Sequence, residues 1–213
     1  MTREELLVQI ENYIPWNEQE ACDREVILEQ LRSRPDIFDR SCLTCHMTAS
    51  AWVTNADHSR ILMAYHNLYD SWSWLGGHAD GDTDLPAVAL REVEEESGIH
   101  SLRILSDGIF SLEVLTVDGH LKRGHYVPSH LHLNLTWLVE ADEREALRIK
   151  ADENSAVAWF TPEEAVSSSS EPWFREHIYS KLNEKMRALT EKSTDNTYEE
   201  SIISESPAGA GLL

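Results

Sequence analysis

Basic residues are scarce in this sequence. Lys and Arg number 18 against 38 Asp and Glu, which gives the 213 residues a formal net charge of −20 at pH 7. A surface of this sign repels phosphate backbones and anionic membranes at long range. We therefore expect no nucleic-acid polymer and no membrane among the partners. An anionic ligand would need bound cations that invert this field locally.

Long apolar runs are also missing. No stretch of about 18 apolar residues, the length that suggests a membrane-spanning helix, occurs in the sequence. The first residues lack the basic region and apolar segment of a secretory signal. The three cysteines, Cys22, Cys42 and Cys45, are too few and odd in number for a disulfide framework. We expect a soluble cytoplasmic protein with reduced thiols.

Two of the cysteines stand beside a histidine in the run from Cys42 to His46. This run matches the short pattern for covalent haem attachment, but that chemistry needs export, which the N-terminus does not indicate. Zinc binding at finger spacing would need a second pair of cysteines or histidines, and none follows. We therefore expect a buried or free pair of thiols.

The length of the chain suits one sizeable domain with modest extensions. Apolar spacing in residues 3–33 predicts two short helices, so we assign residues 1–45 to an N-terminal helical extension. Residues 46–190 are assigned to the main domain, which we expect to be α+β and to end with a helix over 172–189. Residues 191–213, with few large apolar groups, are expected to be a flexible tail.

Strand-like patterns occur throughout the main domain. The first two, joined by a polar link of turn-forming residues, predict a hairpin. In one later segment polar residues alternate with apolar ones, so we expect one polar face that lines a cleft; these residues are His130, His132, Asn134 and Thr136. The segments are 50–55, 60–66, 108–117, 130–140 and 156–160.

The segment from Gly76 to Ile99 predicts one helix with both of its ends marked. Asp84 suits the N-cap, Pro86 fits the first turn, and Gly98 can supply the left-handed residue that ends a helix. Between these signals, apolar residues recur at intervals of four, which favours one buried helix face.

Three carboxylates share another face of this helix. At roughly 100° per residue, Glu92, Glu95 and Glu96 fall within about 100° of one another. Like charges at this spacing cost roughly 0.2–0.5 kcal/mol per pair, and acids near a helix C-terminus also oppose the macrodipole. A bound Mg²⁺ or Mn²⁺ resolves the conflict, because hard cations prefer carboxylate oxygens.

The same segment resembles the Nudix box, the signature of the Nudix hydrolase family. The residues that match at the family spacing are Gly77, Arg91, Glu92, Val93, Glu95, Glu96, Gly98 and Ile99. The departure is Thr83, which stands where the family has its first Glu, with Asp80, Asp82 and Asp84 close by. The resemblance covers roughly residues 46–168.

This resemblance implies a Nudix-type α/β/α sandwich with a mixed β-sheet. It also implies a hydrolase that cleaves a phosphoanhydride bond by attack of water on phosphorus. Glu92, Glu95 and Glu96 would bind Mg²⁺ or Mn²⁺, and Arg91 would orient a neighbouring Glu by a charge-assisted hydrogen bond. These four are the candidate catalytic residues.

A further metal ligand is expected from a loop before the last core strand, because many family members recruit an acid there. Asp152 and Glu153 occupy that place, and Glu153 is our choice. The general base must reach the attacking water directly. Glu92 and Glu153 both stay open for that role.

Substrate contacts are expected next to the box. Gly76, Gly77 and His78 are candidates there, and Arg123, in the basic run 121–125, is a candidate for gripping phosphate. A small-molecule nucleoside triphosphate or nucleoside diphosphate derivative is the default substrate. Aromatic residues such as Trp74 could stack a base.

Two other functions compete with hydrolysis. A nucleotide-sensing domain without catalysis would carry a broken acidic cluster or an attached DNA-binding helix pair, and neither is visible. An isopentenyl-diphosphate isomerase would need a catalytic cysteine beside residues 75–78, and the sequence there is Leu-Gly-Gly-His. A homodimer is compatible with the sequence.

Overall fold

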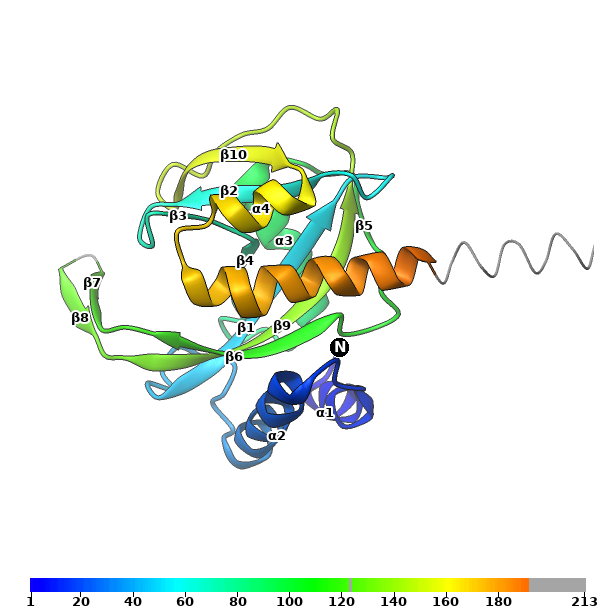
Figure 1. Ribbon diagram of the computed structural model, residues 1–213. Helices are drawn as coiled ribbons and strands as arrows, with labels where there is room; N and C mark the ends of the chain where they lie inside the picture. The colour runs from blue at the N-terminus through cyan, green and yellow to red at the C-terminus, as the bar shows by residue number, and fades with distance from the viewer. Residues whose placement is uncertain (123, 192–213) are drawn as a thin grey trace, which may run out of the picture.

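A mixed, curled β-sheet forms the centre of this computed structural model, which describes residues 1–122 and 124–191 (Figure 1). The strand order is β10-β2-β1-β9-β5, while β3, β4 and β6 pair with β2, β1 and β9 respectively. β7 and β8 pair as a separate ribbon. The strands are β1 Cys45–Thr54, β2 Ile61–His66, β3 Ser71–Ser73, β4 Leu75–His78, β5 Leu102–Ile104, β6 Ser111–Val117, β7 His120–Lys122, β8 His125–Val127, β9 His130–Ala141 and β10 Asn154–Phe160.

Strands β1 and β9 pair in parallel in the middle of the sheet. The pairing runs from Cys45 opposite Leu131 to Thr54 opposite Glu140, and every residue of β1 is buried. β1 and β2 are antiparallel, which confirms the predicted hairpin. The strand begins five residues before the predicted segment 50–55, because β4 and β9 flank its more polar first half.

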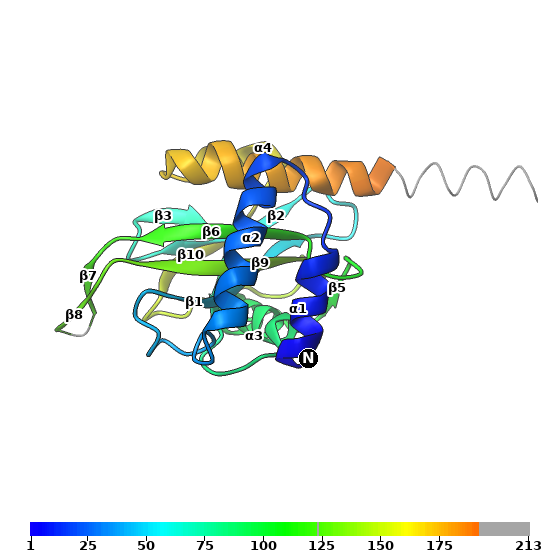
Figure 2. The ribbon, with the colours of Figure 1, turned by 90° about the horizontal axis from the view of Figure 1, so that it is seen from below.

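Helices cover both faces of the sheet, so the predicted α+β class and α/β/α sandwich are confirmed. Figure 2 shows α3 (Leu85–Ser97) on one side and α4 (Pro162–Ser168) with the C-terminal helix (residues 172–191) on the other. The C-terminal helix contains a π-helical segment, η1 (Phe174–Tyr179). Its Tyr179 stacks on Trp52 of β1 with ring centroids 5.4 Å apart, which anchors the helix to the sheet.

The two helices predicted near the N-terminus are α1 (Arg3–Asn12) and α2 (Glu18–Ser33). They lie beside β6 (Figure 1). Their buried residues Leu6, Ile10 and Leu31 belong to the same apolar cluster as Met47 and Ala49 of β1. The boundary between an extension and a main domain stays a prediction. The predicted tail, apart from Glu191, lies outside the described residues.

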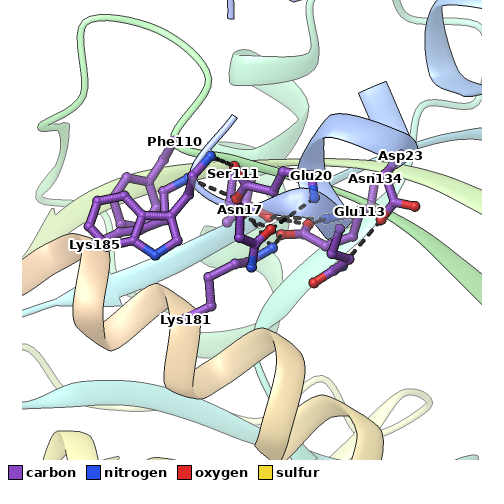
Figure 3. Close-up of polar contacts among 12 residues, drawn as sticks. Asn17, Glu20, Asp23, Phe110, Ser111, Glu113, Asn134, Lys181 and Lys185 are labelled. Carbon is purple, nitrogen blue, oxygen red and sulfur yellow. Dashed lines mark hydrogen bonds and ion pairs between the residues drawn. The ribbon is translucent and has the colours of Figure 1, made fainter. Parts of the chain in front are cut away.

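A buried ionic network joins the N-terminal helices to the C-terminal helix (Figure 3). Lys181 Nζ lies 3.2 Å from Glu20 Oε1 of α2 and 3.0 Å from Glu113 Oε1 of β6, and Lys185 Nζ lies 2.8 Å from Glu20 Oε1. All four side chains are buried. Burial disfavours the charged form of Glu20, but the two ammonium groups lower its pKa to about 2. The network therefore ties three segments that are distant in sequence.

No helix in the described part of the chain is long and apolar enough to cross a membrane.

Candidate functional site

A glycine pair lets α3 lie directly against the sheet. Gly76 and Gly77 of β4 pair with Ser50 and Ala49 of β1. A Cβ atom on Gly77 would lie 2.5 Å from the carboxyl carbon of Glu92, so a larger residue would displace that carboxylate. The predicted helix is confirmed as α3, with Gly98 at its end in the left-handed conformation at φ 76°. The glycine pair and the helix end thus position the box carboxylates.

Three carboxylates converge beside this glycine pair. Glu92 and Glu96 come from α3, and Glu153 comes from the turn before β10; one oxygen from each lies within 4.8 Å of the others. Glu96 is only 4% exposed, and its Oε2 accepts a 3.2 Å hydrogen bond from the Gly76 N–H. Asn154 Nδ2 donates to the Glu96 carbonyl oxygen at 3.0 Å, which links the turn to the helix end.

Glu95, the other carboxylate predicted for this site, points toward solvent and joins the cluster through a lysine. Lys150 Nζ lies 2.7 Å from Glu95 Oε2, 2.9 Å from Glu153 Oε2 and 3.9 Å from Glu92 Oε2. Lys150 was not among the residues predicted for this site from the sequence. Its only signal was its place just before Asp152 and Glu153, in the loop where a further ligand was expected.

The crowding of acids changes their protonation. Burial, together with the negative charge of Glu92, raises the pKa of Glu96 to about 8. Burial also raises the pKa of Glu92, although Lys150 acts in the opposite direction. A divalent cation among these oxygens would favour their charged forms. Three carboxylate groups therefore form a ligand set that fits a hard ion such as Mg²⁺ or Mn²⁺.

This raised pKa predicts a pH-dependent stability. The unfolded chain releases the Glu96 proton near pH 4.5, whereas the metal-free folded protein holds it up to about pH 8. Raising the pH through this window therefore removes the stability that Glu96 contributes to the metal-free protein. Two partly buried histidines, His78 and His132, act in the opposite direction below about pH 7, where the unfolded chain binds protons that the folded chain does not. We expect calorimetry to record a melting temperature at about pH 8.5 that is roughly 3 °C below its value at about pH 7.

Mg²⁺ is expected to reverse that loss, since it binds the ionised carboxylates of the folded state. The matched control is Glu96→Gln, in which the group cannot titrate and this part of the pH dependence disappears. A melting temperature of the metal-free protein that rises between about pH 7 and about pH 8.5, or that Mg²⁺ does not change at about pH 8.5, would contradict the assignment.

Arg91 matches the box pattern, whereas Thr83 departs from it. Arg91 Nη1 lies 3.4 Å from Asp82 Oδ2, so it contacts the loop before α3, while its predicted role of orienting a Glu stays a prediction. Thr83 Oγ1 donates to the Met1 carbonyl oxygen at 2.8 Å. The position of the family's first Glu thus faces the N-terminal segment in this chain.

A cleft of about 750 Å³ contains the carboxylate cluster. This volume is within the range of small-molecule sites. The predicted contact residues Gly76, Gly77 and His78 line it, together with Trp74 and the basic residue Lys122. The polar face predicted for β9 lines it too, through His130, His132 and Asn134. Arg123 lies outside the described residues.

Comparison with known proteins identifies a protein family that matches this chain. The family model described as the NUDIX domain matches residues 45–182. A search of curated proteins finds no match.

Several solved structures are similar in fold. A C. elegans Ap4A hydrolase in a binary complex has 18% identity and a TM-score of 0.50, over 68% of this chain and 98% of that chain. The E. coli dihydroneopterin triphosphate pyrophosphohydrolase has 17% identity and a TM-score of 0.48, over 63% and 92% of the two chains. A MutT protein from Methanosarcina mazei Go1 has 16% identity and a TM-score of 0.49, over 67% and 95%.

At these identities the likeness to the first of these structures concerns the fold alone. The family model, in contrast, spans well over half of the chain and includes the whole box segment with its three carboxylates. The chain therefore belongs to the NUDIX domain family, and the family and the class of hydrolases acting on acid anhydrides inferred from the box residues are confirmed.

Proposed function

We propose that this protein is a metal-dependent pyrophosphohydrolase that uses Mg²⁺ or Mn²⁺. It cleaves a phosphoanhydride bond in a nucleoside triphosphate or a nucleoside diphosphate-linked substrate by attack of water on phosphorus. The observation that carries this proposal is the convergence of Glu92, Glu96 and Glu153 within 4.8 Å at the wall of the cleft.

The residues of the cluster would bind the metal ion and accept the proton of the attacking water. Glu92, Glu96 and Glu153 would hold the metal, which when bound neutralises phosphate charge and makes water more acidic. Lys150 holds Glu95 and Glu153 in place through its two short ion pairs. Two groups can accept the proton of the attacking water: Glu92, with its raised pKa, and Glu153, which is the more exposed.

The rest of the cleft suits a nucleotide. Lys122 lines it and offers positive charge on an otherwise acidic molecule, and Arg40 lines it as well, in an ion pair with Asp80. Trp74 and Tyr126 line it as well and present aromatic surface for a base. Ap4A, named for one of the similar structures, belongs among the dinucleotides of the substrate screen.

A turnover screen tests the proposal. The purified chain with Mg²⁺ or Mn²⁺ is incubated with nucleoside triphosphates, nucleotide sugars, dinucleotides and inorganic polyphosphates in ¹⁸O-labelled water. We expect metal-dependent turnover of at least one nucleotide, with one ¹⁸O atom in a phosphate or phosphomonoester product. Label outside phosphorus, or equal rates in excess chelator, would contradict the mechanism.

Two alternatives have distinct outcomes in the same screen. Tight nucleotide binding without product after long incubation would favour a sensing domain. Isomerisation of isopentenyl diphosphate would favour the related isomerases, although residues 75–78 lack the cysteine those enzymes need. We further propose that the protein is cytoplasmic and that its binding partner is a small-molecule substrate. A homodimer is compatible with this proposal.

A further inference from the structure

Four histidines meet at another wall of the cleft. His46 comes from β1, His78 from β4, and His130 and His132 from β9. His46 lies opposite His132 in the parallel pairing, and His78 lies opposite Thr48 of β1. Alternate residues of a strand share one face, so these pairings place all four imidazoles on the same face of the sheet. Their ring centroids are 4.8 to 5.1 Å apart in five pairs.

The backbone fixes which ring nitrogen of two of these histidines carries hydrogen. His46 Nδ1 lies 3.3 Å from the Cys42 carbonyl oxygen, and His130 Nδ1 lies 2.8 Å from the Pro128 carbonyl oxygen. Because a carbonyl oxygen only accepts, each Nδ1 must be the donor. Each Nε2 of a neutral ring is then left with a free lone pair. Metal-binding histidines are oriented in this same way by their second nitrogen.

The Nε2 atoms of two of the rings lie close together. His130 Nε2 lies 3.2 Å from His132 Nε2. His46 Nε2 is buried without a hydrogen-bond partner among the described residues, and a buried polar atom of this kind is rare and needs an explanation. One nitrogen from each of His46, His130 and His132 lies within 4.8 Å of the others.

Burial disfavours the charged form of three of these rings, those of His46, His78 and His132. It lowers the pKa of His132 to about 2, with a further decrease from the nearby histidines, and it lowers the pKa of His78 to about 2, where Arg40 also contributes. The pKa of His46 is lowered for the same first reason. A neutral imidazole is the form that ligates metal ions.

We infer that His46, His130 and His132 bind one divalent transition-metal ion of the Zn²⁺ class, separate from the carboxylate site. Imidazole suits Zn²⁺ and its neighbours, while carboxylates suit Mg²⁺ and Mn²⁺. Tetrahedral Zn²⁺ with bonds of about 2.0–2.1 Å needs ligand nitrogens about 3.3 Å apart, which the His130 and His132 pair already meets. His78 stands beside the three as a fourth imidazole.

The two sites would flank the same short strand. Gly76 binds Glu96 through its backbone, Gly77 packs on Glu92, and the next residue is His78. A three-histidine site keeps an open position for an oxygen ligand, and both clusters line one cleft. This inference goes beyond the proposed function, whose metal lies at the carboxylates.

Co²⁺ is the probe for this site, because its visible absorption distinguishes four-coordinate from six-coordinate binding. The full chain is first stripped of metal and then saturated with Mg²⁺. We expect this protein to bind one Co²⁺ per chain and to show the intense visible absorption of four-coordinate Co²⁺. Zn²⁺ should displace it, and more Mg²⁺ should not. His46→Gln and His132→Gln should each weaken Co²⁺ binding by about 100-fold or more. His100→Gln, on an exposed residue outside the cleft, is the matched control.

Failure of this inference is separable from failure of the proposed function. A chain with Glu92→Gln, Glu96→Gln and Glu153→Gln should keep the Co²⁺ spectrum while Mg²⁺-dependent turnover is lost. A spectrum that disappears in this variant, or that persists in both histidine variants, would overturn the inference. If the histidine variants unfold, X-ray absorption of the Zn²⁺-loaded wild type decides, and fewer than three imidazoles around zinc would overturn it.

Discussion

Replacing Glu96 with Gln is expected to lower turnover with Mg²⁺ by about 10²–10³-fold while the protein stays folded. Glu96 is the most buried carboxylate of the cluster, and an uncharged amide there cannot supply the negative oxygen that a hard cation needs. Because burial raises the pKa of Glu96, the neutral amide should not lower stability near neutral pH. Steady-state rates and melting temperatures measure the two effects separately.

Glu95→Gln is expected to lose turnover as well, since Glu95 holds Lys150, which in turn contacts Glu92 and Glu153. The matched control is Glu94→Gln on the same helix, whose carboxylate is half exposed and faces His100 at 3.9 Å. This control should keep the wild-type rate. Wild-type rates in both Glu95→Gln and Glu96→Gln would make the metal site at α3 untenable.

Lys181→Met is expected to cost about 3–5 kcal/mol of unfolding free energy. The substitution removes an ammonium group that contacts two buried carboxylates, Glu20 and Glu113, and leaves Glu113 without this ion pair. An uncompensated buried charge is among the most destabilising defects in a protein. In a chain of this size the melting temperature should fall by roughly 6–20 °C, which urea and thermal unfolding can measure.

Arg187→Met is the matched control, because Arg187 lies on the same C-terminal helix and pairs with Glu163 at the exposed surface. Surface ion pairs are worth about 0–1 kcal/mol, so this variant should stay close to wild type. Equal losses in the two variants would mean that the buried network contributes no more than a surface pair. A loss of secondary structure in Lys181→Met alone at ordinary temperature would be the extreme form of the expected result.

Local signals in the sequence predicted the box helix well. The end of α3 depends on Gly98, which adopts the left-handed conformation that other residues avoid, and this information is contained in one residue. The start of α3 was predicted at the right residue, but Asp84 occupies the N-cap position without a capping hydrogen bond from its side chain. The hairpin of β1 and β2 was equally local, since both strands and their polar link lie within one short segment.

The limits of strand and site prediction were set by contacts between distant segments. The first half of β1 carries His46 and Thr48, and its burial depends on pairing with β9, far along the chain. Periodicity placed Glu92 and Glu96 on one helix face. However, only the fold brings Glu153 and Lys150 to them.

The ionic network between the terminal helices has a consequence for where the folding unit ends. The match to the family model begins after Glu20 and stops before Lys185. A fragment cut at those limits would keep Glu113 and Lys181 but lose Glu20 and Lys185, and it would expose the sheet surface that α2 covers. We therefore expect the cooperative unit of folding to extend beyond the family match, with residues of the terminal helices helping to hold the matched region together.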